Sequence, residues 1–303
     1  MARQIIDIDT VQPNGKKGDP ARLMSQKING NFEELYGSVS GLAAVGGDNM
    51  LINCGVPINQ RGFAGGALAA GAYGYDRWKA GTGGCNVTIN ATTGVFTHTS
   101  GPLQQIVEAP QLAWGQPLTI SVENPSGSIS VSVGGATGTI TAGSGRRGVT
   151  LTPSGSGNLT VQLTASGVTY ARPKLERGSA ASPFVVRPQA LEVALCQRYY
   201  QKSYNLATTP GTVTNEGRVT WGSGNLTNSL NRAYVTFKCV MRAPPAIVLR
   251  GAPSGTTGVI SQADGTNVAA SPEAIGETGF NAAWSNTNGQ WGGWWHWTAD
   301  SEI

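Results

Sequence analysis

The chain has 303 residues, of which 13% are charged and 43 are glycine, and its formal net charge is +4. An average soluble domain is about a quarter charged and about 7% glycine, so this composition is typical of short strands joined by tight turns and, with eight Trp, not of a disordered chain. Lys and Arg occur in isolated pairs such as Arg146-Arg147, whereas a nucleic-acid groove needs a basic stripe, so we expect no nucleic-acid partner.

An extended arm is predicted for residues 1–18. Its first residues, MARQIIDIDT, lack the apolar core of a secretory signal, so we expect synthesis in the cytoplasm. The alternation in QIIDIDTV indicates one strand, which ends at Pro13. No stretch of the sequence reaches the ~18 uninterrupted apolar residues of a membrane-spanning helix, so we expect no membrane insertion.

A helix of roughly 17 residues follows the arm and, because of that length, is only marginally stable alone. Asp19 suits its N-cap and Pro20 its first position, and Gly37 and Gly41 are expected to end or fray it. One face carries the apolar residues Met24, Ile28, Phe32 and Leu35. The flanking sequence is glycine-rich and offers little local core, so we favour packing against copies of the same helix over packing within its own domain.

A β-sandwich or jelly roll is predicted for residues 49–184, after a glycine-rich linker that completes residues 1–48. Short segments with period-2 alternation recur there between turn residues, from CNVTIN at Cys85 to VTYARPKLE at Val168. Strands this numerous and evenly spaced are typical of an all-β sandwich. The GxGxxG sequence at residues 143–148 has expected strands on both sides, so we interpret it as a glycine loop and not as a dinucleotide site.

A short helical joint and a second, smaller sandwich complete a fold that we predict to be mainly β. Pro188 suits a helix start and apolar residues recur from there to Tyr200, so we expect the joint over residues 185–204. Residues 205–303 return to alternating segments, of which AYVTFKCV is the clearest, and this predicts a C-terminal β-domain.

Aromatic residues concentrate near the end of the sequence, where five of the eight Trp lie within twenty residues. The candidate receptor-binding residues combine these Trp with polar neighbours: Trp284, Asn286, Asn288, Trp291, Trp294, Trp295, His296 and Trp297. Rigid aromatic side chains mixed with Asn and Gly are typical of contact surfaces. The pattern also fits a closing strand in which Trp294 and Trp295 point to opposite faces, one into the core, and both interpretations stay open.

The tripeptide Asp76-Arg77-Trp78 also has two interpretations. As a sugar site, the indole would stack on a sugar face while Asp76 and Arg77 bind hydroxyl groups. As a core element, it would be an ion pair covered by an aromatic side chain. We favour the core interpretation, because a Trp is usually well buried.

Catalytic, metal and cofactor sites have little support in the sequence. The 17 acidic residues are scattered and offer no local pair suited to glycoside hydrolysis, and a Gly-x-Ser-x-Gly elbow is absent. Four Cys without CxxC spacing and two His do not favour a zinc site. We expect no enzyme activity, cofactor or metal, and reduced, mostly buried thiols, with a later disulfide left open.

Several segments resemble the tail-fibre proteins of tailed phages. Residues 175–204 contain LERGS, then PF and RP, then ALCQRYYQKS. These resemble a junction at which a lectin-like β-sandwich meets a distal receptor-binding domain. GDPARLMSQKINGNFEELY at 18–36 resembles a virion-attachment segment. INQRG at 58–62 and DRW at 76–78 resemble the opening of a galactose-binding-like sandwich.

The resemblance implies a homotrimeric phage tail fibre, located in the virion tail, that binds the bacterial host. Baseplate or trimer contacts would come from Met24, Ile28, Phe32, Leu35 and Tyr36. The first sandwich would be a shaft or a carbohydrate-binding-like module, and residues 205–303 would bind a surface receptor: lipopolysaccharide, capsule or pilus. Two alternatives remain, a depolymerase or esterase tip and a purely structural baseplate protein.

Overall fold

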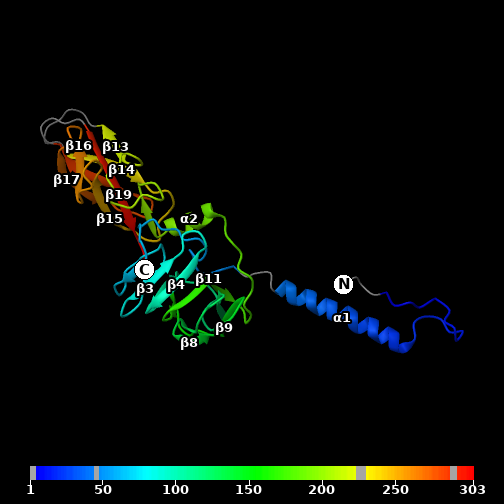
Figure 1. Ribbon diagram of the computed structural model, residues 1–303. Helices are drawn as coiled ribbons and strands as arrows, with labels where there is room; N and C mark the ends of the chain where they lie inside the picture. Colours follow the sequence, from blue (N-terminus) through cyan, green and yellow to red (C-terminus); the bar gives the residue numbers. More distant parts are fainter. Residues whose placement is uncertain (1–4, 44–47, 223–229, 287–291) are drawn as a thin grey trace. The chain divides into compact units, whose positions relative to one another are not determined.

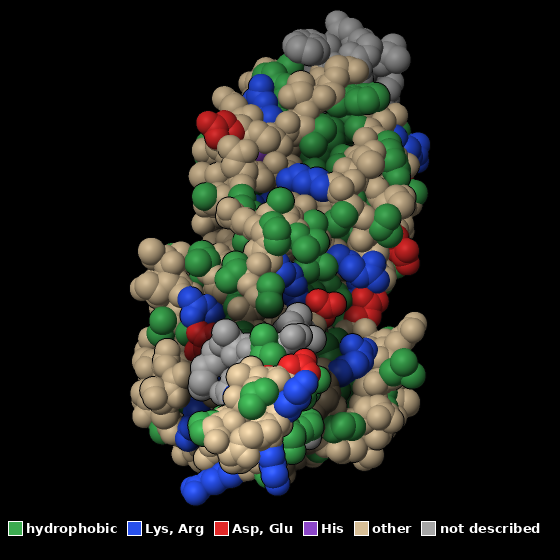
Figure 2. Space-filling view, turned by 90° about the vertical axis from the view of Figure 1, so that its right-hand side faces the viewer, with side chains coloured by type: hydrophobic (Ala, Val, Ile, Leu, Met, Phe, Trp, Pro, Cys, Tyr) green, Lys and Arg blue, Asp and Glu red, His purple; other side chains and the backbone are tan. Residues whose placement is uncertain are grey.

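The computed structural model describes residues 5–43, 48–222, 230–286 and 292–303, with backbone alone for 36–43 (Figure 1). Two compact units are present: Met1–Asp48 with Ser182–Val185, and Asn49–Ala181 with Val186–Ile303. The second unit contains both β-sandwiches. On the face seen in Figure 2, Lys and Arg side chains are spread among uncharged ones, in keeping with the low charge of the sequence. Among the described helices, none has the length and apolar character needed to cross a membrane.

The first unit differs from the sequence prediction in its arm. No strand forms over the described part of QIIDIDTV, and one isolated bridge, Val11 to Lys17, is found there instead. The arm folds back, because the carboxylate of Asp19 accepts hydrogen bonds from the backbone N of Asp7 at 2.8 Å and from Lys27 Nζ at 2.7 Å. A strand needs a neighbouring strand to satisfy its backbone, and this segment satisfies its backbone through local turns.

Helix α1 spans Ala21–Ala43 and is longer than predicted. The carbonyl of Pro20 accepts the first helical hydrogen bond from Met24 N at 3.0 Å, so Pro20 precedes the helix and does not occupy its first position. The helix continues through Gly37 and Gly41, so these residues do not end it. Glycine weakens a helix interior by about 1 kcal/mol relative to Ala, a cost that neighbouring helical residues can outweigh.

The first sandwich is formed by two antiparallel sheets, as predicted for this region. The larger has the strand order β1-β3-β4-β11-β6-β9 and the smaller the order β2-β5-β10-β7-β8. The larger sheet comprises β1 (Gly66–Leu68), β3 (Cys85–Ile89), β4 (Val95–Ser100), β6 (Leu118–Glu123), β9 (Arg146–Leu151) and β11 (Val168–Arg177). The smaller comprises β2 (Lys79–Ala80), β5 (Pro102–Val107), β7 (Ile129–Val133), β8 (Ala136–Ile140) and β10 (Leu159–Thr164).

Alternation along these strands builds the core of the first sandwich. In β10, Leu159, Val161 and Leu163 are fully buried, whereas Thr160 and Gln162 between them are exposed and half-buried. The GxGxxG sequence lies in the loop and strand start between β8 and β9, where Gly145 has φ of 71°. This is the glycine loop that the sequence predicted, since such a φ is unfavourable for residues with a side chain.

Helix α2 (Gln189–Gln197) leads from the first sandwich into the second and begins directly after Pro188, as predicted. The next strand, β12 (Tyr200–Lys202), pairs with the last strand of the chain, β19 (Gly292–Asp300). The C-terminal sandwich therefore begins at β12, inside the stretch that the sequence analysis assigned to the helical joint.

The C-terminal sandwich is organised around β19, which pairs with β12, β13, β15 and β16. Its other strands are β13 (Val219–Gly222), β14 (Leu230–Thr236), β15 (Ala246–Gly251), β16 (Val259–Gln262), β17 (Asn267–Glu273) and β18 (Gly279–Ser285). Strand β17 changes partner along its length: Val268 pairs with β16, whereas Ser271 pairs with β18. It thereby passes from one layer to the other, and the core lies between the layers.

Candidate functional site

The two sandwiches meet in a buried polar contact zone. We call this zone the joint, as distinct from the helical joint predicted for residues 185–204. Four separate stretches of sequence supply it: residues 58–62, 73–79, 198–204 and 300–303. Three of these contain residues of the tail-fibre-like segments, and the fourth is the end of the chain. The joint therefore brings together residues that are far apart in the sequence.

Arg77 is the central cation of the joint. Its Nη1 forms an ion pair with Glu302, and the two side chains are only 1% and 3% exposed. The backbone N of Arg77 also donates to Glu302 Oε1 at 3.1 Å. The ring of Tyr199 covers the guanidinium, whose central carbon lies 3.4 Å from the ring centroid. Residues 225 positions apart in the sequence thus connect the two sandwiches.

Arg61 has a similar set of contacts, with an acidic partner and a Tyr ring over its guanidinium. Its Nη1 lies 2.7 Å from Asp300 Oδ2, and its guanidinium sits 4.0 Å from the ring centroid of Tyr200 and 5.3 Å from that of Tyr73. The hydroxyl of Tyr73 donates to the carbonyl oxygen of Ile303 at 2.5 Å. Two neighbouring Tyr of the QRYYQKS sequence therefore each cover one Arg of the first sandwich.

Asp76 and Gln60 form the polar floor of the joint. The backbone N of Gln60 donates to Asp76 Oδ1 at 3.1 Å, and Gln60 Nε2 donates to Asp76 Oδ2 and to the carbonyl of Tyr200, each at 2.8 Å. Burial raises the pKa of Asp76 to about 7, against the hydrogen bonds from Gln60, which lower it. Burial also raises the pKa of Glu302, although Arg77 and Arg61 oppose the shift.

Lys202 is buried in a cage of backbone oxygens. Its Nζ donates to the carbonyls of Gln60 at 2.7 Å, Leu206 at 2.9 Å and Thr208 at 2.6 Å. An ammonium group has three donors, so this cage satisfies all of them. Burial lowers the pKa of Lys202 to about 8, and the residue joins the loop after β12 to the first sandwich.

The acidic residues of the joint have the raised pKa values of general acids, but their position does not suit catalysis. Asp76 is 0% exposed and the side chain of Glu302 is 3% exposed. A polysaccharide cannot reach either carboxyl group in this arrangement. Among the described residues, no group of His, Cys, Asp and Glu side chains is arranged to hold a metal ion. What the contacts of the joint do show is a connection between the two sandwiches.

The Asp76-Arg77-Trp78 tripeptide lies in the interior, which is the interpretation that we favoured from sequence. The details differ, because the acid that pairs with Arg77 is Glu302 and the ring that covers it belongs to Tyr199. Trp78 is fully buried and its ring meets Phe96 edge-on, at 5.6 Å between centroids. None of the three side chains is available to a sugar.

Most of the candidate receptor-binding residues are also buried. Trp284, Trp295 and Trp297 belong to the core of the C-terminal sandwich, and Asn286 and His296 are buried as well. Trp294 is half-buried on the opposite face of β19, with the guanidinium of Arg218 4.6 Å from its ring centroid. Asn288 and Trp291 lie outside the described residues.

This burial corrects the surface interpretation for the five buried side chains. Period-2 alternation along β19 sends Trp295 and Trp297 into the core and leaves Trp294 facing outward, as the closing-strand interpretation predicted. The His296 imidazole stacks on Tyr204, with ring centroids 3.9 Å apart, and Ser203 Oγ lies 2.9 Å from its Nδ1. Burial lowers the pKa of His296.

The candidate baseplate or trimer residues lie on α1. Met24, Phe32 and Leu35 are 39%, 51% and 54% exposed, and Ile28 is half-buried. The side chain of Tyr36 lies outside the described residues. The apolar face that the spacing predicted is therefore present on the helix.

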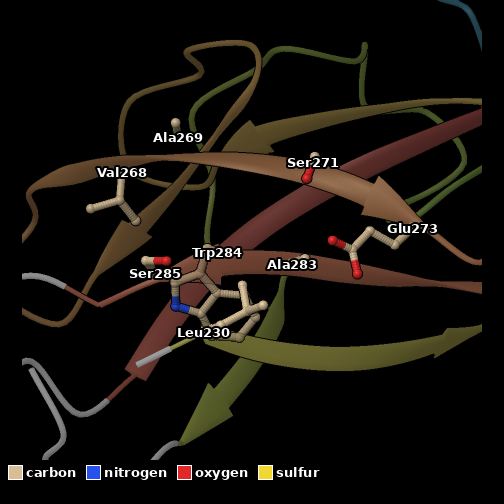
Figure 3. Close-up of a pocket in the computed structure, with 8 residues that line it drawn as sticks. All are labelled: Leu230, Val268, Ala269, Ser271, Glu273, Ala283, Trp284 and Ser285. Atoms are coloured by element: carbon tan, nitrogen blue, oxygen red, sulfur yellow. The ribbon is translucent and has the colours of Figure 1, made fainter. Parts of the chain in front are cut away.

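A surface pocket of about 370 Å³ lies on the C-terminal sandwich, at strands β14, β17 and β18 (Figure 3). It is lined by Leu230, Val268, Ala269, Ser271, Glu273, Ala283, Trp284 and Ser285. Of these residues, Trp284 alone is among the candidates predicted from the sequence. Small residues spread over three strands leave no recognisable motif, so no sequence signal could have identified this pocket.

All four cysteines are unpaired, and Cys54, Cys85 and Cys196 are buried while Cys239 is half-buried. Burial raises the pKa of Cys85 to about 11. Because the thiolate is the reactive form, a raised pKa makes this thiol a poor nucleophile. The expectation of reduced, mostly buried thiols agrees with this arrangement.

No protein-family model matches the chain, and no curated protein matches it. Among solved structures, discoidin II of Dictyostelium discoideum is 10% identical, over 73% of this chain and 83% of that chain, with a TM-score of 0.23. A Paenibacillus sp. cycloisomaltooligosaccharide glucanotransferase is 12% identical, over 80% of this chain and 47% of that chain, with a TM-score of 0.22. At such TM-scores, neither likeness carries an argument about this chain.

Proposed function

We propose that this chain is a non-enzymatic attachment protein of the phage tail-fibre class, which binds a receptor on the bacterial surface through its C-terminal sandwich. The observation that supports this proposal is the joint. The INQRG, DRW and QRYYQKS residues that resemble tail fibres lock two sandwiches into one unit. Such a rigid connection suits a fibre, because it holds a distal binding domain on its mount in a defined orientation.

The burial of the side chains supports different roles for the joint and for the surface of the C-terminal sandwich. The joint uses its charged and aromatic residues internally, which leaves recognition to exposed parts of the C-terminal sandwich. Helix α1, with exposed Met24 and Leu35, would supply trimer or baseplate contacts. In a trimer, several weak sites act together and gain avidity without any new contact.

Binding of the fluorescently labelled full chain to a broad panel of bacterial strains tests this function. We expect saturable binding to some strains and none to others, without release of reducing sugars or acyl groups from their surface polysaccharide. Absence of saturable binding to every strain would overturn the receptor role and favour a structural baseplate protein. Release of sugars or acyl groups would favour the enzyme alternative.

Sedimentation of the full chain tests the assembly. We expect a trimer, and we expect the double variant Met24→Ser, Leu35→Ser to be monomeric with unchanged thermal unfolding of the β-sandwiches. A monomeric wild-type chain, or a trimer that survives the double substitution, would contradict the proposed role of the helix.

A further inference from the structure

The pocket exists because one strand changes partner. Val268 and Ala269 of β17 follow β16, whereas Ala270 already pairs with Trp284 of β18. Beyond that pair, Ser285 continues along β18 beside Leu230 of β14. The two layers separate at this corner, and Figure 3 shows Val268 and Ala269 on one side of the gap with Trp284 and Ser285 on the other. The hollow is thus a product of topology and not of one loop.

The floor and walls combine small residues with a few polar groups. Ala269 and the two hydroxyl residues Ser271 and Ser285 are exposed, and Ala283 contributes a small, buried floor. Leu230, 53% exposed, is the main apolar side chain open to solvent. A volume of about 370 Å³ falls in the range of small-molecule sites, roughly 300–1,000 Å³.

The charge of the pocket is balanced. Of the described side chains that line it, Glu273 alone is charged, and Arg232 of β14 pairs with it at 2.8 Å between Nε and Oε2. Because Glu273 is already paired with Arg232, it does not need a cationic ligand, and its carboxylate disfavours an acidic one. It keeps free lone pairs that accept hydrogen bonds from hydroxyl groups, and the guanidinium keeps N–H groups that donate them.

The indole of Trp284 does not act as a stacking platform here. It is 2% exposed, and its Nε1 already donates to Asn286 Oδ1 at 2.9 Å. The pocket therefore offers hydroxyl donors and acceptors at the rim and short aliphatic contacts inside. A ligand that matches it carries many hydroxyl groups, no net charge and some C–H surface.

We propose that this pocket binds a neutral sugar residue. The inference deepens the proposed function, on which it rests for the identification of that sugar with part of a bacterial surface glycan. A hexose has about twelve non-hydrogen atoms, and a modest ligand efficiency places its Kd on the order of 1 mM. Affinity of this kind is useful only in a multivalent fibre.

Ligand-detected NMR on the full chain tests the site, with galactose, glucose, mannose, N-acetylglucosamine and N-acetylgalactosamine as separate probes. We expect at least one of the five to bind. Ser271→Trp fills the pocket and should weaken binding at least tenfold. Ser130→Trp makes the same change at an exposed strand position of the first sandwich and should leave binding unchanged. Glu273→Gln, which keeps the side-chain shape, should weaken it about tenfold.

The outcomes separate the pocket from the wider function. If none of the five sugars binds, or if binding survives both Ser271→Trp and Glu273→Gln, the pocket assignment is overturned. Should the chain bind cells while the sugar fails to compete and the pocket variants bind as wild type, the attachment function stands without this site. Should a sugar bind in the pocket of a chain that binds no cells, the site stands and the attachment function falls.

Discussion

The joint and the pocket both contain an Arg–Glu pair, but they expose this pair very differently. In the joint, the side chains of Arg77 and Glu302 are 1% and 3% exposed, whereas at the pocket those of Arg232 and Glu273 are 51% and 38% exposed. The buried pair fixes two sandwiches against each other, and the exposed pair is open to a ligand. Burial, and not residue type, therefore distinguishes the pair that connects the sandwiches from the pair for which we propose a role in recognition.

The largest effect that tests this comparison is the loss of the central cation of the joint. Arg77→Met removes the closer of the two guanidinium groups that pair with buried Glu302, because the other, that of Arg61, lies 3.7 Å from its Oε1. Breaking a buried ion pair by removing one partner costs about 3–5 kcal/mol, and we expect a loss near the lower end of this range. Arg232→Met removes an exposed partner and should cost no more than about 1 kcal/mol. Urea unfolding of both variants measures the difference. Equal losses would mean that the joint is not the stabilising contact that its burial indicates.

Some of these structural features could be predicted from the sequence and others could not. Alternation and turn residues predicted most strands of the first sandwich and the opposite faces of Trp294 and Trp295, because a half-buried strand has period 2. They did not predict β5, whose sequence PLQQIV alternates weakly. The partner of Arg77 was not predictable, since Glu302 is 225 positions away in the sequence and no local pattern connects the two.

The next effect in size concerns the caged lysine. Lys202→Met keeps most of the aliphatic side chain but leaves one buried and two part-buried backbone oxygens without their donor, which should cost on the order of 3 kcal/mol. Lys238 donates through its Nζ to one backbone oxygen, at 3.2 Å, so Lys238→Met should cost clearly less. Thermal unfolding compares the two. A smaller loss for Lys202→Met than for Lys238→Met would contradict the structural role of the cage.

A further effect is expected in the pH dependence of stability. The pKa of Asp76 is raised in the folded state to about 7 from an ordinary 3.8, so between these values the folded state binds more protons than the unfolded state. The free energy of unfolding of the wild type must then fall as pH rises through this window, relative to Asp76→Asn. Thermal unfolding of both proteins from pH 4 to pH 8 measures this difference.

The comparison with Asp76→Asn isolates this one group. The raised pKa of Glu302 acts in the same direction, and the lowered pKa values of His98 and His296 act in the opposite one, but these groups are present in both proteins. Parallel pH profiles for wild type and Asp76→Asn would show that Asp76 titrates normally and that the floor of the joint is open to water.

Cell binding by the Ser271→Trp variant tests most directly that recognition belongs to the exposed face of the C-terminal sandwich while the joint is structural. Binding of labelled full chain to a susceptible strain is measured for wild type, Ser271→Trp and the Ser130→Trp control. We predict that Ser271→Trp loses at least tenfold in affinity at an unchanged unfolding temperature, and that the control binds as wild type. Wild-type binding by Ser271→Trp would contradict the account.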